Sequence, residues 1–231
     1  MGRLSTRRAA GRRRGTGARA YLCEIAISLE SIQKSARRKF FENYNPSFNF
    51  TAEVGPDGGI DGCFQMGPNN ASHPGLAPIL SEKLLKAREL GFKVIRMTNI
   101  GTVRSPEIPE DMLLTVESTD AYWVYAERLS NCSEFIKNLS CGYHDYEIIK
   151  QSRQPGSPRT LARAVAEWVD GDALSAHYAF NSDVFCTNDR GSSAGASSIF
   201  HPNNLAKLKK QFSIVVLSPD ELSSAVIDEE R

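Results

Sequence analysis

Apolar positions recur at helical spacing through residues 21–41, the first patterned segment of the chain. The stripe consists of Leu22, Ile25, Leu29, Ile32, Ala36 and Phe40. Residues three or four apart share one face of an α-helix, so the spacing predicts a helix with one buried face. Glu30 borders the stripe, whereas Glu24 falls on the opposite side of this helix.

The segment from Asn45 to Pro78 is rich in Gly, Pro and Asn and shows no periodicity, so we expect a long loop or insertion there. Residues 81–90 are patterned as a helix, and Gly91 is the type of residue that commonly ends one. Residues 92–97 are apolar enough for a strand. A helix, a glycine and a strand in this order indicate an α/β unit.

Three helical patterns lie between residues 118 and 180. Long helices are predicted over residues 118–139 and 159–168, with Trp123 and Trp168 as core anchors. A shorter helix is predicted over residues 172–180, so that Asp172 stands at its first position.

Two short apolar runs, Val184–Thr187 and Ser213–Leu217, are predicted to be buried strands, with a basic helix over residues 205–212 between them. Ser218 and Glu221 then form a capping box that opens a final helix. Apolar strands that alternate with helices favour a parallel sheet covered on both faces. The expected fold class is α/β, a three-layer sandwich around a mostly parallel central sheet.

Charge is distributed unevenly along the 231 residues. Residues 1–19 hold seven arginines and no acid, while the remainder holds 21 basic and 27 acidic side chains. We therefore expect a disordered tail at 1–19 and one domain over 20–231, with an insertion at about 45–80. The tail is open to three interpretations: an arm that contacts phosphates, a transit-like segment, or an unselected start of the reading frame.

The five cysteines show no Cys-x-x-Cys spacing, which argues against a zinc site and against a disulfide framework. No apolar run approaches the roughly 20 residues that span a bilayer. The expectation is a cytoplasmic protein with no membrane segment.

Two carboxylates are placed where a parallel sheet gathers its functional residues. Asp189 follows the strand at 184–187, and Asp172 opens the helix that leads into that strand, so both should lie at the carboxyl edge of the sheet. Asp183 should lie at the opposite edge. Converging carboxylates repel each other unless a cation lies between them, and oxygen ligands suit Mg²⁺ or Mn²⁺. The alternative is that Asp172 is a helix cap and Asp189 a turn residue.

The stretch VAEWVDGDALSAHYAFNSDVFCTNDRG at residues 165–191, followed by SIVVLSPDEL at residues 213–222, resembles the C-terminal half of the PIN (PilT N-terminus) domain family. The shared pattern is an Asp at a helix start, a small-residue helix, an apolar strand and Thr-x-Asp. The helix at residues 22–41 is similar to the family's early helix, which carries an acidic ligand.

The resemblance implies a Mg²⁺- or Mn²⁺-dependent endoribonuclease, and many members of the family are toxins of toxin–antitoxin pairs. Asp172, Asp189 and Glu30 would be the catalytic metal ligands, and Thr187 and Asn188 would orient a ligand or the scissile phosphate. RNA is the implied partner, and a cognate antitoxin and a homodimer remain open.

One element of the family pattern is missing from the sequence. The family's first acid sits in an opening strand, in an apolar-Asp-x-Asn motif, and residues 1–20 supply no such strand. The chain is then either a degraded or truncated copy, or one whose true start lies upstream. Weakened activity is expected, and the alternative is an inactive PIN-like remnant that binds RNA or a protein.

Overall fold

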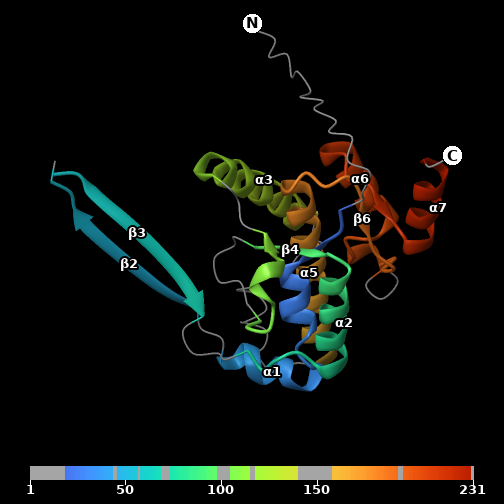
Figure 1. Cartoon of the computed structure of the whole chain (residues 1–231), viewed down its shortest axis with the longest axis horizontal. Helices are drawn as coiled ribbons and strands as arrows, with labels where there is room; N and C mark the ends of the chain where they lie inside the picture. The colour runs from blue at the N-terminus through green and yellow to red at the C-terminus, as the bar shows by residue number, and fades with distance from the viewer. Residues whose placement is uncertain are drawn as a thin grey trace, which may run out of the picture.

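The computed structural model describes residues 19–43, 46–56, 58–68, 73–97, 105–114, 118–139, 158–191 and 195–229. Helices surround short parallel sheets, so the chain is a mixed α/β protein (Figure 1). One sheet has the order β1-β4-β5, formed by β1 (Tyr21–Cys23), β4 (Lys93–Ile95) and β5 (Leu113–Leu114). A second parallel pair joins β6 (Phe185–Cys186) to β7 (Val216–Leu217).

The single helix predicted over residues 21–41 is wrong at its beginning. The chain opens with the strand β1, turns through the π-helix η1 (Ala26–Glu30), and forms α1 (Lys34–Asn43) only afterwards. Tyr21 pairs with Lys93 in a parallel ladder. That long-range pairing satisfies the backbone groups of β1, and it outweighs the local helical spacing.

The expected loop at 45–78 is also wrong over most of its length. Two antiparallel strands, β2 (Pro46–Val54) and β3 (Ile60–Pro68), pair over their whole length and extend away from the other elements (Figure 1). Between them, the Gly58 N–H donates to the Gly55 carbonyl, and Gly58 has a positive φ of 78° that favours glycine. The two-residue alternation of Phe48, Phe50 and Ala52 was the signal for a strand.

The helices at 81–90, 118–139 and 205–212 are confirmed as α2 (Pro78–Glu89), α3 (Thr119–Asn138) and α6 (Pro202–Phe212). Gly91 ends α2 with a φ of +80°. The final helix α7 (Pro219–Glu229) begins with the predicted capping box. Ser218 N–H donates to Glu221 Oε2 at 2.6 Å, and Glu221 N–H donates to Ser218 Oγ at 3.2 Å.

The two helices predicted between residues 159 and 180 are one continuous helix, α5 (Pro158–Ala179). Gly171 lies inside this helix and packs against α3. A Cβ added at this glycine would lie 3.3 Å from Cγ2 of Ile136, so the small residue permits close helix packing. Asp172 is therefore an interior residue of α5, and its prediction as a helix start is wrong.

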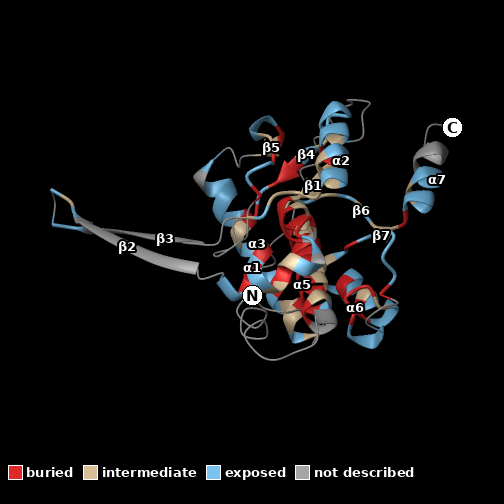
Figure 2. Ribbon diagram, turned by 90° about the horizontal axis from the view of Figure 1, so that it is seen from below, coloured by how far each residue is buried: buried red, intermediate tan, exposed pale blue. Residues whose placement is uncertain are grey.

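Figure 2 shows that burial concentrates on α5 and on the elements around it. The largest cluster of buried residues joins η1, α1, α3 and α5, and it includes Leu29, Phe41, Tyr125 and Trp168. Trp168 is a core residue, as predicted, but Trp123 is 64% exposed, so its prediction as a core anchor is wrong. The strands β6 and β7 are shorter and less buried than the sequence suggested.

Candidate functional site

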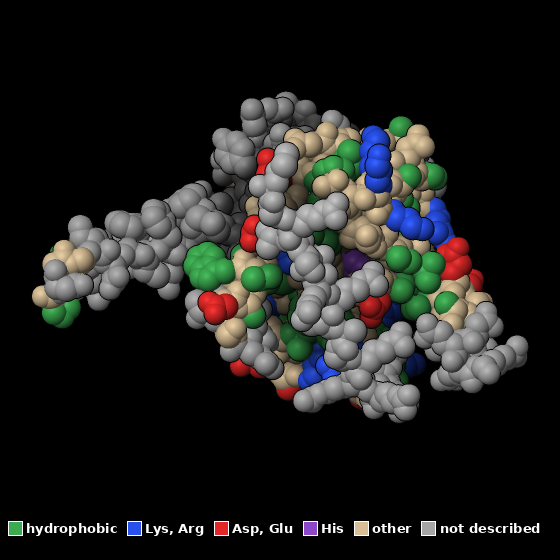
Figure 3. Space-filling view, turned by 90° about the horizontal axis from the view of Figure 1, so that it is seen from above, with side chains coloured by type: hydrophobic (Ala, Val, Ile, Leu, Met, Phe, Trp, Pro, Cys, Tyr) green, Lys and Arg blue, Asp and Glu red, His purple; other side chains and the backbone are tan. Residues whose placement is uncertain are grey.

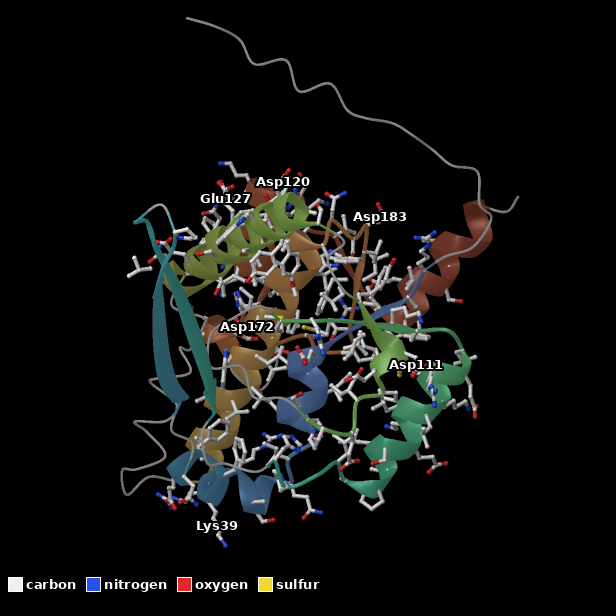
Figure 4. All side chains as sticks on the ribbon, turned by 60° about the vertical axis from the view of Figure 1, so that its left-hand side comes forward. Lys39, Asp111, Asp120, Glu127, Asp172 and Asp183 are labelled. Atoms are coloured by element: carbon white, nitrogen blue, oxygen red, sulfur yellow. The ribbon has the colours of Figure 1, made fainter. Side chains whose placement is uncertain are left out.

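Asp172 is buried inside the fold and hydrogen-bonded within its own helix. Its side chain is 5% exposed, and Trp168 Nε1–H donates to Asp172 Oδ2 at 2.8 Å. The two residues are one turn apart on α5, a spacing that brings side chains together on a helix face. Figure 4 shows Asp172 in the interior, well separated from Asp183, which precedes β6.

The direction of α5 brings Asp172 to the carboxyl end of β1. Tyr21 at the start of β1 packs against Phe180, just beyond the end of α5, with ring centroids 5.0 Å apart. Eight residues of helix, from Phe180 back to Asp172, span about 12 Å. Three residues of strand, from Tyr21 to Glu24, span about 10 Å. An antiparallel packing of α5 on β1 would bring Asp172 level with Glu24, and the Cys23 thiol is subject to the charges of both carboxylates.

Glu24 is the carboxylate that comes directly after β1. It is 3% exposed, and Met97 N–H, just past β4, donates to Glu24 Oε2 at 2.9 Å. The sequence interpretation set Glu24 aside because a helix over residues 21–41 would turn it away from the apolar stripe. Since residues 21–23 form a strand, Glu24 instead lies at the carboxyl edge of the sheet, and the argument against it is wrong.

The electrostatics of neighbouring groups places the two carboxylates in one small region. Burial chiefly, and the charges of Asp172 and Glu24 in part, raise the pKa of the Cys23 thiol to about 12. The pKa of Tyr125 is likewise raised well above its usual range, first by burial and then by Cys23, Glu24 and Asp172. Tyr125 reaches this region from α3, where its hydroxyl donates to the Arg96 carbonyl at 3.1 Å.

Two carboxylates are a suitable but minimal donor set for a hard cation. Mg²⁺ is commonly held by one or two carboxylates together with waters and substrate phosphates, and Glu24 and Asp172 fit that description. Within the part of the chain that the structure describes, no group of three or more His, Cys, Asp or Glu side chains could hold a metal ion. A cation between two buried carboxylates would offset their mutual repulsion.

Asp189 lies at the carboxyl end of β6, as predicted, but on the surface. Its Oδ1 accepts the Gly191 N–H at 2.7 Å, and its own N–H donates to Thr187 Oγ1 at 3.0 Å. Both contacts shape the turn after β6, which fits the turn-residue alternative. Asn188 is exposed beside them. The sharing of one cation by Asp172 and Asp189 stays a prediction.

Glu167 is a buried carboxylate that sequence reasoning missed. It is 5% exposed, and Glu167 Oε2 accepts the Ile199 N–H at 3.2 Å. Its pKa is raised, chiefly by burial and in part by the charge of Asp189, which places Asp189 near Glu167. Its position on the apolar face of the helix was the feature of the sequence that could have predicted its burial.

Glu30 is the last residue of η1, and its side chain lies outside the described residues. Its role as a metal ligand therefore stays a prediction.

No family model matches the sequence, and no curated protein or solved structure is significantly similar to it. Among the described helices, none is both long and apolar enough to span a membrane. The geometry and chemistry of the buried carboxylates therefore carry the functional argument.

Proposed function

We propose that the chain is a PIN-like, Mg²⁺- or Mn²⁺-dependent endoribonuclease of weak activity, with Glu24 and Asp172 at its centre. The observation that carries the proposal is the burial of these two carboxylates together, one after the opening strand and one from α5. Glu24, directly after β1, then takes the place of the acid that the family pattern has in its opening strand.

The arrangement of strands supports a PIN-like three-layer sandwich. β1, β4 and β5 follow one another in a parallel sheet, and β6 and β7 form a second parallel pair. Functional residues of open parallel sheets gather at the carboxyl ends of the strands, which is where Glu24 and Asp189 stand.

In this proposal Glu24 and Asp172 hold the cation, directly or through water, and Asp189 and Glu30 complete its surroundings when RNA binds. The Met97 N–H and the Trp168 indole fix the orientation of the two central carboxylates. A bound Mg²⁺ or Mn²⁺ would supply an activated water and neutralise charge on the phosphodiester. A toxin-type role with a cognate antitoxin belongs to the same proposal.

A second candidate is a PIN-like protein without catalysis that binds RNA or a protein. The burial of Glu24 and Asp172, at 3% and 5% exposure, favours it because a phosphodiester must reach a metal held there. The absence of a third metal-ligating side chain among the described residues points the same way.

Thermal shift and RNA cleavage, measured together, test the proposal. Mn²⁺ should raise the melting temperature of the wild type, because a cation that binds the folded state stabilises it by mass action. The shift should vanish in Asp172→Asn and in Glu24→Gln but persist in the control Asp183→Asn. Weak, chelator-sensitive cleavage of mixed RNA should follow the same pattern.

Each result separates the candidates. A thermal shift without any cleavage supports the inactive protein. An equal shift in the wild type and in Asp172→Asn would remove the metal site from both.

A further inference from the structure

The outer face of α3 is acidic and aromatic, and it stands apart from the candidate metal site. Its exposed side chains recur at positions i, i+3, i+4, i+7 and i+14, which share one side of a helix. They are Asp120, Trp123, Val124, Glu127 and Glu134. We call this surface the α3 face. Figure 4 shows Asp120 and Glu127 on the outside of α3.

Trp123 is the dominant apolar group of the α3 face. It is 64% exposed, and Val124 beside it is 57% exposed. The ring of Tyr122 packs edge-on against the Trp123 ring, with ring centroids 5.5 Å apart. Figure 3 shows hydrophobic and acidic side chains next to one another on the side of the molecule that includes α3. Contiguous exposed apolar groups of this kind often mark a surface that binds a partner.

The charge of the α3 face selects a cationic occupant. Three carboxylates lie on it and no lysine or arginine does, and among the described residues none of the three takes part in an ion pair. The side chain of Arg128, also on α3, is directed to Tyr178 and not to the α3 face. Its Nη2 donates to the Tyr178 carbonyl at 2.6 Å, and its guanidinium lies over the Tyr178 ring. Exposed carboxylates would repel the phosphates of a nucleic acid.

Residues 1–18 of this chain have the matching composition. They hold six arginines and no acid. A guanidinium can pair with carboxylates and also stack on the indole of an exposed tryptophan, and Trp is the best aromatic partner for a cation.

The described chain starts close to α3. Tyr21 packs against Phe180, and Arg128 on α3 bonds to Asn181 Oδ1 at 3.3 Å, so Arg19 enters the fold beside the Arg128 turn of α3. Eighteen residues can reach up to about 60 Å when extended. The 20 residues of α3 span about 30 Å, so the segment is long enough to follow the whole face.

We propose that the α3 face is the docking surface for the arginine-rich segment 1–18 of the same chain, with Trp123 as the central contact. Docking onto a folded surface adds contacts without changing the core. The effect on the melting temperature should be small, because exposed ion pairs contribute little to stability.

Quenching of tryptophan fluorescence by neutral acrylamide in the full chain tests the proposal, because Trp168 is only 6% exposed and Trp123 supplies the accessible signal. Trp123→Phe gives the background from Trp168. The wild type should show a lower quenching constant at about 0.01 M salt than at about 1 M, where the Debye length falls from about 30 to about 3 Å. We expect a difference of about twofold or more, since an exposed cation–π contact favours docking about twofold to fivefold.

Two full-length variants provide the matched comparison. One replaces the six arginines of residues 1–18 with glutamine, and the other combines Asp120→Asn, Glu127→Gln and Glu134→Gln. Both should show the high quenching constant at every salt concentration. A wild type that behaves like the glutamine variant would overturn the proposal.

The same assay distinguishes two other ligands that could cover the α3 face. Protection of Trp123 that grows with protein concentration would mean docking onto a second copy and would overturn the intramolecular proposal. Protection by a single-stranded RNA oligonucleotide, equal in the wild type and in the glutamine variant, would make the face a base-stacking surface and would also overturn it.

Discussion

Among single residues, Trp168 has two roles. Its hydrogen bond to Asp172 orients that carboxylate, and the same hydrogen bond joins the core to the candidate site. The indole packs in the main cluster of buried residues while its N–H donates to the carboxylate. A buried carboxylate without such a donor loses its compensation for leaving water. Trp168 is therefore a positioning residue for Asp172 and a structural residue for the fold.

We expect Trp168→Phe to lower the free energy of unfolding by about 2 kcal/mol, because it leaves a buried carboxyl group without one of its hydrogen-bond donors. Trp123→Phe is the matched control, and it should change the free energy by less than about 0.5 kcal/mol because Trp123 is exposed. Urea denaturation of both variants measures the difference. Equal losses would show that the Trp168 hydrogen bond contributes nothing measurable.

Among the contacts between elements, the packing of β6 against α5 involves a buried histidine. His177, in the last turn of α5, packs edge-on against Phe185 of β6 with ring centroids 5.6 Å apart. Burial lowers the pKa of His177 from its usual 6.5 to about 4, although the nearby Asp183 raises it. Protonation of His177 therefore opposes the packing of β6 against α5.

The sign of the pH effect follows from this depressed pKa. Between pH 6.5 and about 4 the unfolded chain binds the His177 proton and the folded chain does not, so stability is lost as pH falls through that window. The loss has an upper bound of about 3.5 kcal/mol at about 1.4 kcal/mol per pKa unit. In His177→Phe, which keeps the ring, unfolding free energies measured across this range should fall less steeply. Identical pH profiles for the two proteins would contradict a buried neutral His177.

At the scale of the whole molecule, the β2–β3 hairpin stands apart from the helices and parallel sheets (Figure 1). Its strands pair with each other over residues 46–54 and 60–68 and with no other described strand. A two-stranded ribbon adds little to the stability of the body from which it projects.

Replacing residues 46–68 with a short Gly/Ser linker should change the free energy of unfolding by less than about 1 kcal/mol, since loop length enters only logarithmically. Circular dichroism during urea unfolding measures the change. Phe41→Ala is the reference for a true core loss: Phe41 is fully buried, and such truncations cost about 3–5 kcal/mol. A loss near that size in the linker variant would mean that the hairpin packs on the body.

The sequence by itself determined the elements whose signals are local. α2 with Gly91, α3 with its Ser118 cap and α7 with the Ser218–Glu221 box were all predictable, because caps and helical periodicity involve residues within one or two turns. Asp172 was identified as a candidate from its segment alone. The alternation in 46–54 was also a local signal, although the Gly and Pro content obscured it.

Tertiary structure alone decided the opening strand and the site it builds. The run Tyr21–Cys23 is too short to distinguish a strand from a helix, and its partner Lys93–Ile95 lies some seventy residues further along the chain. Once that pairing forms, Glu24 becomes the residue at the strand end and is buried with Asp172, while Asp189 stays at the surface beside Glu167. Backbone pairing and burial of this kind depend on contacts that no local window contains, which is why the sequence pointed to Glu30 and the fold buries Glu24 at the end of β1.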